Sequence, residues 1–411
     1  MAADNGRPSK KLIAYVGCYA TAGSGSGGIH VLAVSPDGRH LNETSRVLEP
    51  QQAGYLVYSP SLKTLFSVDE RKTDGRGPVG PAASVHSFSV NARDGSLNWK
   101  NSYLAPGPMP TYLSFSESRR LLVTANHGDF THVERVIQWP NGEWGTEYVY
   151  DDSTVIMFQV ADDGRLDGIR DVKVLPGHGR DPNSSPQAGG HAQSSAHAHC
   201  ATLDPSGQFI VVCDKGTDQI YVYRLSSELV EVSSFRFEDE IGPRHVAFDA
   251  STGRAFVTCE FSSELASFDF DAATGRLILL DRVSTVADAH SGLNEPADVR
   301  VHPDGKFVYV NNRGEDSVAW FEVTPTGRLT RRGHVSISKS IHPGLAARSF
   351  AFDPSGSFML VADRPANLVR SYSVDRETGN LQALSDASVR DPAFIEFAEL
   401  PLAGQTQPAT H

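Results

Sequence analysis

No hydrophobic run in this chain is long enough to cross a membrane or to form the core of a signal peptide. The N-terminal segment MAADNGRPSKKLIAYVG has a basic patch, but its apolar run is too short for a secretion signal. Cysteine is scarce: four occur in 411 residues, widely spaced, and none forms a Cys-x-x-Cys pair. This pattern favours buried free thiols in a reducing compartment over disulfides or a cysteine metal site. We therefore expect a cytoplasmic protein with no membrane partner.

Several common catalytic and binding motifs are also missing. There is no Gly-x-Ser-x-Gly sequence, and no serine or cysteine has an evident histidine partner, which argues against a covalent nucleophile. The glycine runs GSGSGG and Gly189-Gly190 lack the strand-to-helix context of a phosphate loop. A formal net charge of −12 argues against nucleic-acid binding. Long segments with a 3.6-residue period are absent, so we expect little helix.

What the chain does contain is a repeated pattern of an apolar run, a polar turn and a second apolar run. The pattern occurs six times, with the turns YSPSLK, FSESRR, LDPSGQ, FDASTG, VHPDGK and FDPSGS. Each turn is a hairpin signal, and an aromatic-rich strand with its own polar turn follows most of them, as in ELASFDFDAATGRL. One unit therefore holds about four short strands, which is the content of a propeller blade. The sequence predicts an all-β fold.

The two ends of the chain supply a seventh blade. The N-terminal segment KKLIAYVGCYATAGSGSGGIHVLAVSPDGRHL contains outer-type strands, and PAFIEFAEL near the C-terminus is a strand without a partner of its own. Joining them closes the ring and removes free sheet edges. We therefore predict a single domain over residues 1–411, a seven-bladed β-propeller with blades of four antiparallel strands, closed by pairing of the N- and C-terminal strands.

Two insertions interrupt the repeat near the mouth of the predicted channel. Residues 130–153 contain a tryptophan-bearing loop around VIQWPNGEWGTEY, and residues 176–196 are rich in Gly, Ser, Pro and His. The second insertion is typical of an irregular surface loop. Because it leads directly to His199, it is either a lid over the mouth or a surface decoration. The ends of the chain, about 1–10 and 403–411, are predicted to be disordered tails.

The repeat also places charged residues in register. Six residues before the third residue of each turn, the first strands begin with Gly54, Thr111, His199, Arg244, Ala297 and Arg348. Ten residues after the same point, the second strands end with Glu70, His127, Lys215, Glu260, Arg313 and Arg364. Both sets lie at one rim of the hairpins, away from the turns. This ring of rim positions is basic and bears histidines in an otherwise acidic chain, which indicates a small anionic ligand.

Four of the rim positions form the strongest candidate catalytic site. Arg244 begins one strand and Glu260 ends the next, so their side chains can meet across the rim. His199 and Arg313 occupy the same registers in neighbouring units. Together the four residues can bind an anion and move a proton. A purely structural pair between Arg244 and Glu260 stays open as the alternative.

The other ionisable rim positions are candidate substrate-binding residues. These are Arg348, Arg364, His127, Lys215 and Glu70, with His197 beside His199. For Glu70, His127 and Lys215 the alternative is a solvated strand end. The two arginines share one blade, next to that of Arg313, which favours an anion site.

A metal site at this rim has one argument for it and two against. His197, His199 and Cys200 form a His-x-His-Cys sequence, and alternating histidines on a strand can share one face. However, no further Asp, Glu or His cluster has an evident place there, and the neighbouring arginines and lysine repel a divalent cation. Calcium needs several carboxylate oxygens, whereas the rim offers only two glutamates. We therefore expect no metal ion and no cofactor.

At these residues the chain resembles the seven-bladed propeller lactonase family, which includes bacterial 6-phosphogluconolactonases and fungal carboxy-cis,cis-muconate cyclases. The likeness covers nearly the whole chain, and it is carried by GPRH with Glu260 sixteen residues after the arginine, by HAHCATLDPSG before it and by NNRGEDS after it. The resemblance implies that a His, two Arg and a Glu line the central pocket; they fall here on His199, Arg244, Arg313 and Glu260. The N-terminal YVGCYA, in place of the family's YVGTYT, and the His-rich insertion depart from the pattern, so the substrate is not carried over.

The leading hypothesis is metal-independent hydrolysis of a small anionic lactone in the central channel. Arg244 and Arg313 would bind a carboxylate or phosphate and stabilise the oxyanion. An ionised Glu260 suits a base that activates water, and a His199 that titrates near neutrality suits the acid that protonates the departing alkoxide. Three alternatives stay open: a lactone-forming cycloisomerase of a carboxymuconate-type acid, a non-enzymatic propeller scaffold, and a metal-dependent sugar lactonase. The chain is expected to act as a monomer or a dimer, a question that the sequence leaves open.

Overall fold

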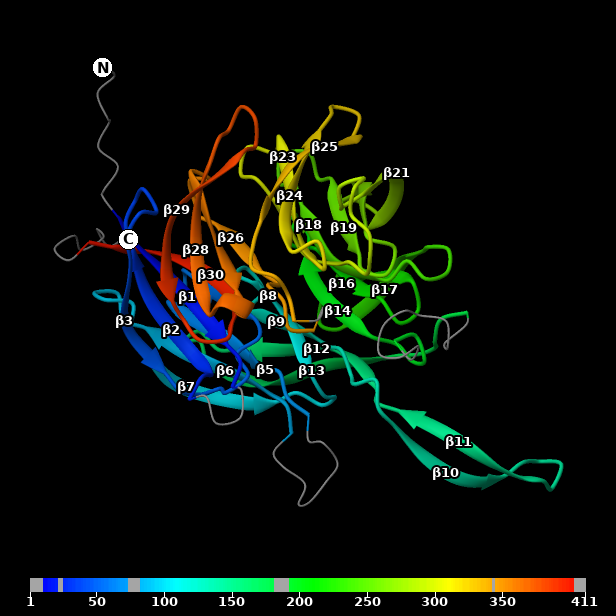
Figure 1. Cartoon of the computed structure of the whole chain (residues 1–411). Coiled ribbons are helices and arrows are strands. Elements are labelled where there is room, and N and C mark those ends of the chain that lie inside the picture. Colours follow the sequence, from blue (N-terminus) through cyan, green and yellow to red (C-terminus); the bar gives the residue numbers. More distant parts are fainter. Residues whose placement is uncertain (1–9, 21–24, 73–81, 181–191, 342–343, 403–411) are drawn as a thin grey trace.

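Seven four-stranded antiparallel sheets surround a common axis in the computed structural model, which describes residues 10–20, 25–72, 82–180, 192–341 and 344–402 (Figure 1). Among these residues the only helical element is the 3-10 turn η2, Arg364–Ala366. The predicted all-β, seven-bladed propeller is therefore confirmed. The predicted tails fall outside the described residues, except for Lys10, with which the first strand begins.

Six blades are built from consecutive stretches of chain. The strands of the first three are β4 (Leu56–Ser59), β5 (Thr64–Asp69), β6 (Ser84–Val90) and β7 (Leu97–Leu104); β8 (Pro110–Ser116), β9 (Leu121–Asn126), β12 (Ser153–Val160) and β13 (Leu166–Leu175); and β14 (Ala198–Leu203), β15 (Phe209–Asp214), β16 (Gln219–Leu225) and β17 (Leu229–Arg236). The strands of the next three are β18 (Pro243–Phe248), β19 (Ala255–Cys259), β20 (Glu264–Asp271) and β21 (Arg276–Ser284); β22 (Glu295–Val301), β23 (Phe307–Arg313), β24 (Ser317–Val323) and β25 (Leu329–Ser336); and β26 (Phe350–Phe352), β27 (Phe358–Asp363), β28 (Leu368–Val374) and β29 (Leu381–Ser388).

The seventh blade joins the two ends of the chain, as predicted. Its strand order is β3 (Leu41–Val47), β2 (Gly28–Val34), β1 (Lys10–Cys18) and β30 (Pro392–Pro401). The register of β1 and β30 runs from Lys10 opposite Pro401 to Cys18 opposite Pro392. Strand β30 contacts β4 and β26, the first strands of its two neighbours, so it occupies the position next to the channel. The C-terminal strand thus closes the ring.

Three of the six polar turns, LDPSGQ, FDASTG and FDPSGS, are held by the aspartate in their second position. In LDPSGQ, the Asp204 carboxylate accepts hydrogen bonds from the backbone N–H groups of Ser206, Gln208 and Phe209 at 3.0, 2.9 and 2.7 Å. Gly207 supplies the left-handed backbone that closes the turn, with φ +70°. Asp353 makes the same contacts in FDPSGS, to Ser355 and Phe358 at 2.9 and 2.8 Å. These turns fix where each strand pair begins, and so fix the register of the opposite rim.

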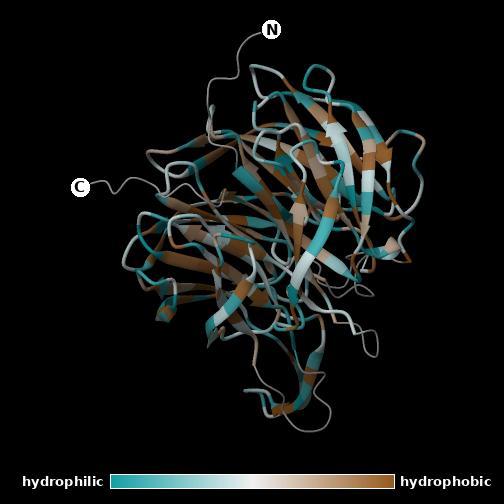
Figure 2. Ribbon diagram, turned by 90° about the vertical axis from the view of Figure 1, so that its left-hand side faces the viewer, coloured by the Kyte–Doolittle hydropathy of each residue, from teal (hydrophilic) through white to brown (hydrophobic). Residues whose placement is uncertain are grey.

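Within a blade, burial is greatest at the second strand and lowest at the outermost strand. The second strands, such as β5, β15 and β27, are buried along their whole length, whereas the outermost strands, such as β17, alternate exposed and half-buried residues. Apolar segments accordingly lie along the inner strands, with hydrophilic segments at the loops and edges (Figure 2). Because the blades pack face to face, the residues at the strand ends near the axis are held by two sheets each.

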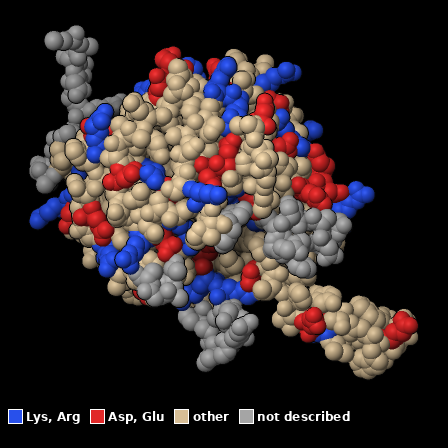
Figure 3. Space-filling view, in the orientation of Figure 1, with Lys and Arg blue, Asp and Glu red and all other residues tan. Residues whose placement is uncertain are grey.

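The first insertion forms a hairpin that projects from the propeller body (Figure 1). Its strands are β10 (His132–Gln138) and β11 (Trp144–Tyr150), which pair only with each other among the described residues. On the face seen in Figure 3 the hairpin shows only a few charged side chains, whereas acidic and basic side chains are interspersed over the body. Of the second insertion, residues 181–191 lie outside the described part of the chain. Its predicted role as a lid or a decoration therefore stays a prediction.

All four cysteines are buried and free, as the sequence predicts. The side chains of Cys18, Cys200, Cys213 and Cys259 lie on inner strands of the blades. Across the described ranges, no helix has the length and apolar character needed to span a membrane.

Candidate active site

A buried cluster of three cations around Glu260 occupies the rim where blades three to five meet the axis. Arg244 Nε lies 2.7 Å from Glu260 Oε2, while Lys215 Nζ and Arg313 Nη2 lie 2.9 and 3.2 Å from Oε1. Arg313 Nη2 also lies 3.3 Å from Glu295 Oε2. The predicted meeting of Arg244 and Glu260 across the rim is confirmed. We call Lys215, Arg244, Glu260 and Arg313 the cationic cluster.

The cations of the cationic cluster hold Glu260 in its ionised form. Burial would raise the pKa of Glu260, but Lys215, Arg313 and Arg244 outweigh it and hold that pKa well below its usual range. Burial, with the charge of Arg313, lowers the pKa of Arg244 to about 10, so its guanidinium is still protonated at neutral pH. Glu260 is only 1 % exposed, and both of its oxygens face cations. Its carboxylate is therefore anionic, as expected, but it is enclosed by the groups that it neutralises.

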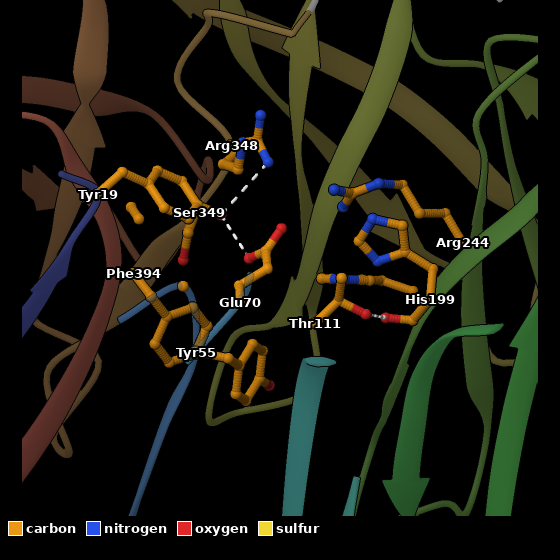
Figure 4. A pocket seen from close by; sticks show the side chains of 12 residues that line it. Tyr19, Tyr55, Glu70, Thr111, His199, Arg244, Arg348, Ser349 and Phe394 are labelled. Atoms are coloured by element: carbon orange, nitrogen blue, oxygen red, sulfur yellow. Dashed lines mark hydrogen bonds between the residues drawn. The ribbon is translucent and has the colours of Figure 1, made fainter. Parts of the chain in front are cut away.

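Beside this cluster lies a small pocket (Figure 4). Arg244 and His199 line one side and face Glu70 and Arg348 across the opening, with Tyr19 next to them (Figure 4). The full lining is Tyr19, Gly54, Tyr55, Glu70, Thr111, His199, Arg244, His245, Arg348, Ser349, Ala393 and Phe394. The space open to the centres of water molecules is about 20 Å³. Four of the predicted site residues, His199, Arg244, Arg348 and Glu70, thus share one pocket.

Four of the lining side chains, those of His199, Arg244, His245 and Arg348, have buried polar atoms with no hydrogen-bond partner among the described residues. Two of these atoms belong to the wall formed by Arg244 and His199 and make no ion pair either. They are Nη1 of Arg244 and Nδ1 of His199. A buried donor or acceptor without a partner costs about 1–3 kcal/mol, and more when the group is charged. Both atoms belong to the same wall of the pocket, so a ligand with an acceptor oxygen there would satisfy them.

The opposite wall is organised by a tyrosine that the sequence analysis missed. Tyr19 Oη donates a hydrogen bond to Glu70 Oε2 at 2.7 Å and accepts one from Arg348 Nη1 at 3.4 Å. Burial is the main cause that raises the pKa of Glu70. The guanidinium of Arg364 lies over the Tyr19 ring, 4.7 Å from its centroid, and its Nε pairs with Asp391 at 3.2 Å. Arg364 therefore supports the outer side of this wall and is not among the residues that line the pocket.

The three candidate histidines pack against one another at the rim. The ring of His127 lies 5.3 Å from that of His199 and 4.7 Å from that of His197. His127 and Lys215 are both 4 % exposed, so the alternative that they are solvated strand ends is wrong. His197 Nδ1 donates to the backbone oxygen of His127 at 2.9 Å and Nε2 lies 3.4 Å from Ser195 Oγ, so both of its ring nitrogens have partners within the chain. Among the described residues, no group of three or more His, Cys, Asp or Glu side chains is arranged to hold a metal ion.

The expected near-neutral titration of His199 is wrong. Burial lowers its pKa well below the usual range, and the neighbouring charge of Arg244 and the ring of His245 lower it further. His199 is therefore a neutral imidazole at pH 7, able to donate through one nitrogen and accept through the other. Burial likewise lowers the pKa of His127 well below its usual range and that of His197 to about 4.

A second, deeper layer of residues was not predicted, although the repeat contains it. One position after the first-strand rim residues stand Tyr55, Tyr112, Cys200, His245, Asp298 and Ser349. Tyr55, His245 and Ser349 line the pocket, and the ring of Phe394 in β30 packs against that of Tyr55, tilted by 32°, with centroids 3.9 Å apart. Neighbouring strand residues normally face opposite ways, but irregular pairing near the start of β18 lets both Arg244 and His245 reach the channel.

Over nearly its whole length the chain is similar to known propeller lactonases. The family model "Lactonase, 7-bladed beta-propeller" matches residues 13–397. A 6-phosphogluconolactonase of Bacillus subtilis is 28% identical over 390 residues, which is 94% of this chain and 98% of that protein. The structure of the periplasmic gluconolactonase of Pseudomonas aeruginosa is 25% identical, with a TM-score of 0.76 over 96% of this chain and 100% of the other. A Lactobacillus plantarum structure is 26% identical, with a TM-score of 0.77 over 95% and 100% of the two chains. The chain belongs to the seven-bladed β-propeller lactonase family and is a lactonase enzyme.

Proposed function

We propose that this enzyme hydrolyses a small anionic sugar lactone in the pocket beside the cationic cluster, without a metal ion, in the cytoplasm. The observation that carries the proposal is the Arg244 guanidinium, which is 2 % exposed and keeps one nitrogen, Nη1, without a partner in the pocket. A buried guanidinium N–H aimed into a pocket favours an anionic or strongly polarised oxygen at that point. The carbonyl oxygen of a lactone becomes such an oxygen when water attacks it.

The cationic cluster would act on the carbonyl through Arg244. Glu260 fixes the guanidinium by its Nε at 2.7 Å, so Nη1 is positioned before the substrate arrives. A donor held in this way stabilises the developing oxyanion without reorganising during the reaction. Since both Glu260 oxygens face cations, its part here is to hold Arg244, Arg313 and Lys215 in place. This differs from the expected role of Glu260 as the base that activates water.

His199 would contact the leaving oxygen of the lactone ring. It lies on the same wall as Arg244, is neutral, and offers an unpartnered Nδ1 to the pocket. A neutral imidazole that donates a hydrogen bond to the ring oxygen weakens the bond that must break. Because His199 is neutral at pH 7, it donates this hydrogen bond without placing a full positive charge beside the ring oxygen.

The substrate would be a phosphorylated aldonolactone, with the unphosphorylated sugar lactone as the comparison. This choice is supported by the relatives, one named a 6-phosphogluconolactonase and one a gluconolactonase, and by the second arginine, Arg348, across the pocket. The pocket volume that the centres of water molecules can reach is about 20 Å³, which is room for roughly one or two water molecules. Only the reacting group fits there without side-chain movement, so the rest of the substrate would lie in the mouth above.

The test is a set of initial rates for three substrates. The purified protein is incubated with 6-phosphogluconolactone and with gluconolactone in a pH-stat, against the spontaneous rates, and with a carboxymuconate followed by ultraviolet absorbance. We expect hydrolysis of lactone, faster for the phosphorylated one. Turnover of the carboxymuconate without lactone hydrolysis would overturn the proposal in favour of the cycloisomerase alternative.

Arg244→Ala should weaken binding of the open acid 6-phosphogluconate by about 10- to 100-fold, because a hydrogen bond to an ion contributes about 1.5–3 kcal/mol. A neutral sugar lactone analogue should lose less affinity. Arg313→Ala should show a smaller difference between the two ligands, since Arg313 contacts Glu260 and Glu295 and is not among the residues that line the pocket. Isothermal titration calorimetry of both variants with both ligands checks this. Equal losses for charged and neutral ligands would assign Arg244 a structural role.

Removal of metal ions should leave the rate unchanged. The purified enzyme is dialysed against a chelator, its metal content is measured, and its rate on 6-phosphogluconolactone is compared with that of the untreated protein. We expect the two rates to agree within about twofold. A loss of activity that Zn²⁺, Mn²⁺ or Ca²⁺ restores would favour the metal-dependent lactonase alternative instead.

A further inference from the structure

The pocket contains a second histidine that the proposed reaction does not yet use. His245 follows Arg244 on β18, is 6 % exposed and lines the pocket. Its ring lies 5.1 Å from that of His199 and 5.2 Å, edge to face, from that of Tyr112. Its Nε2 is buried and has no hydrogen-bond partner among the described residues. A polar atom of this kind calls for a ligand or a function.

The other ring nitrogen of His245 is held by a carboxylate. Nδ1 lies 3.2 Å from Asp298 Oδ1, and Asp298 in turn accepts hydrogen bonds from Ser349 Oγ and Arg300 Nε, both at 3.2 Å. Burial raises the pKa of Asp298, but Arg300 and His245 outweigh it and hold that pKa at about 2. The carboxylate is therefore ionised, and the imidazole must place its single proton on Nδ1. Nε2 is left with a free lone pair.

We propose that His245 is the catalytic base of this enzyme, which takes a proton from the attacking water through Nε2, and that Asp298 is the positioning residue that fixes its tautomer. The inference rests on the proposed lactone hydrolysis and supplies the group that activates water. It follows from three observations together: the carboxylate on Nδ1, the unpartnered Nε2, and the place of the ring in the pocket wall beside Arg244. A histidine oriented by a carboxylate and facing a reaction centre is the general arrangement of an acid–base catalyst.

The proton and the electrons balance over the two steps. As the water oxygen bonds to the lactone carbonyl carbon, one water proton moves to Nε2 of His245, and the carbonyl π electrons move to the oxygen beside Arg244. When that pair returns, the bond between the carbonyl carbon and the ring oxygen breaks. The proton on Nε2 then moves to the ring oxygen. The product is the open hydroxy acid, and His245 is neutral again.

His199 is less suited to this step. No described carboxylate contacts its ring, so nothing fixes which of its nitrogens carries the proton. His199 can therefore donate to the ring oxygen while His245 accepts from water. The two rings face the same small pocket, which brings both functions to one reacting carbon.

The groups around His245 set the sign of its pH dependence. Burial lowers its pKa to about 4, with Arg244 of the same strand and Arg300 lowering it and Asp298 raising it. Its other neighbours, Tyr112 and His199, are uncharged near neutral pH because burial raises the pKa of the phenol to about 12 and lowers that of the imidazole well below its usual range. A base must be unprotonated, so activity is present above the pKa of His245 and is lost as the pH falls through it. Removing the charge of Asp298 takes away the contribution that raises this pKa.

The chain offers a matched control pair far from the pocket. His302 is 2 % exposed, and its Nδ1 lies 2.8 Å from Asp304 Oδ1. Its Nε2 donates to the backbone oxygen of Gly356 at 2.8 Å, so this ring has no free nitrogen. The pair lies at the turn between β22 and β23, at the end of the blade away from the rim. Substitutions there report the cost of disturbing a buried histidine and its more exposed carboxylate partner without touching the site.

The experiment compares His245→Asn and Asp298→Asn with His302→Asn and Asp304→Asn. Asparagine places an amide N–H near the position of Nδ1, so His245→Asn keeps a donor to Asp298 but has no Nε2. For each full-length protein we measure melting temperature, kcat and KM on 6-phosphogluconolactone from pH 3.5 to 9, and the dissociation constant of 6-phosphogluconate. We expect His245→Asn to lower kcat by about 100- to 10,000-fold with product affinity within threefold of the parent. Asp298→Asn should lower kcat and move the acid limb of the kcat profile to lower pH, while both control variants retain kcat and its profile.

Each other outcome overturns the proposal. If His245→Asn retains kcat within threefold, or loses product affinity in proportion to kcat, His245 is not the base. If His245→Asn fails to fold, Asp298→Asn decides: a folded variant with parental kcat and an unmoved acid limb contradicts the role of the pair. If the parent enzyme hydrolyses lactones and both variants remain active, the proposed role of His245 is wrong but the proposed function stands. If the parent is inactive on every lactone, the proposed function is wrong as well.

Discussion

Replacing Glu260 with glutamine is expected to lower kcat by about 100- to several thousand-fold. The carboxylate neutralises Lys215, Arg244 and Arg313, each within 3.2 Å of one of its oxygens. Glutamine retains one acceptor oxygen and points an amide N–H₂ group at a cation, so at least one of the three loses its partner. Breaking a buried ion pair on one side costs about 3–5 kcal/mol. If that cost falls on the positioning of Arg244 in the transition state, it corresponds to the stated loss in rate.

The same substitution one strand further out provides the control for Glu260. Glu264 on β20 of the same blade pairs with Arg282 Nη2 at 2.7 Å, in a partly exposed position away from the pocket. Glu264→Gln should keep kcat within about twofold, since partly exposed pairs contribute about 0–1 kcal/mol. Steady-state rates on 6-phosphogluconolactone are taken well below the melting temperature of each variant, measured by circular dichroism. Near-parental kcat in a folded Glu260→Gln variant would show that the cationic cluster has no part in the reaction.

The fold was predictable because a propeller repeats its local signals. In three of the six turns the carboxylate of an aspartate in the second position accepts hydrogen bonds from backbone N–H groups two or more residues further on, as with Asp204 and Asp353, so the turn and its flanking strands are visible in a short window of sequence. The superposition of the turns also aligns the opposite rim, whose positions lie six residues before and ten residues after the third residue of each turn. This is why Arg244 and Glu260 were expected to meet, although they belong to different strands.

Three of the lining residues that the sequence analysis missed, Tyr19, Ala393 and Phe394, belong to the blade that lacks this signal. Tyr19 follows β1, which is the second strand of the closing blade, and so stands where Glu70 follows β5 in the next. Ala393 and Phe394 stand at the start of β30, where Thr111 and Tyr112 stand in β8. The first and second strands of this blade come from opposite ends of the chain, so no turn joins them and the superposition could not align them.

Burial explains why the sequence predicted the charge of Glu260 correctly and the pKa of His199 wrongly. The ionised state of Glu260 depends on nearby cations, which the register already placed around it. The neutral state of His199 depends first on the loss of water around its ring, and only then on Arg244. Desolvation arises from the packing of several blades around the channel, and no window of sequence reports it. Residue identity therefore predicted the direction of the pKa shift of Glu260 and not that of His199.

Deletion of residues 390–411 is expected to abolish the cooperative fold. It removes β30, and with it the partner of β1 and the buried side chains of Phe394, Ile395 and Leu400. Three such side chains contribute about 1.5–3 kcal/mol each, so their sum is comparable with the whole stability of about 5–15 kcal/mol of a typical domain. Phe394 also lines the pocket against Tyr55, so the opening would damage the site as well.

The shorter deletion of residues 403–411 separates this effect from the loss of chain length. It leaves β30 complete from Pro392 to Pro401 and removes none of the contacts that close the ring. We expect it to melt like the full chain and to stay soluble, whereas the 390–411 deletion exposes β1 as a free strand edge and aggregates. Thermal melts with simultaneous light scattering compare the two proteins at equal concentration. A 390–411 deletion that melts with the full chain and remains monomeric would mean that the pairing of β1 with β30 contributes nothing to closure, and that six blades suffice to hold the propeller together.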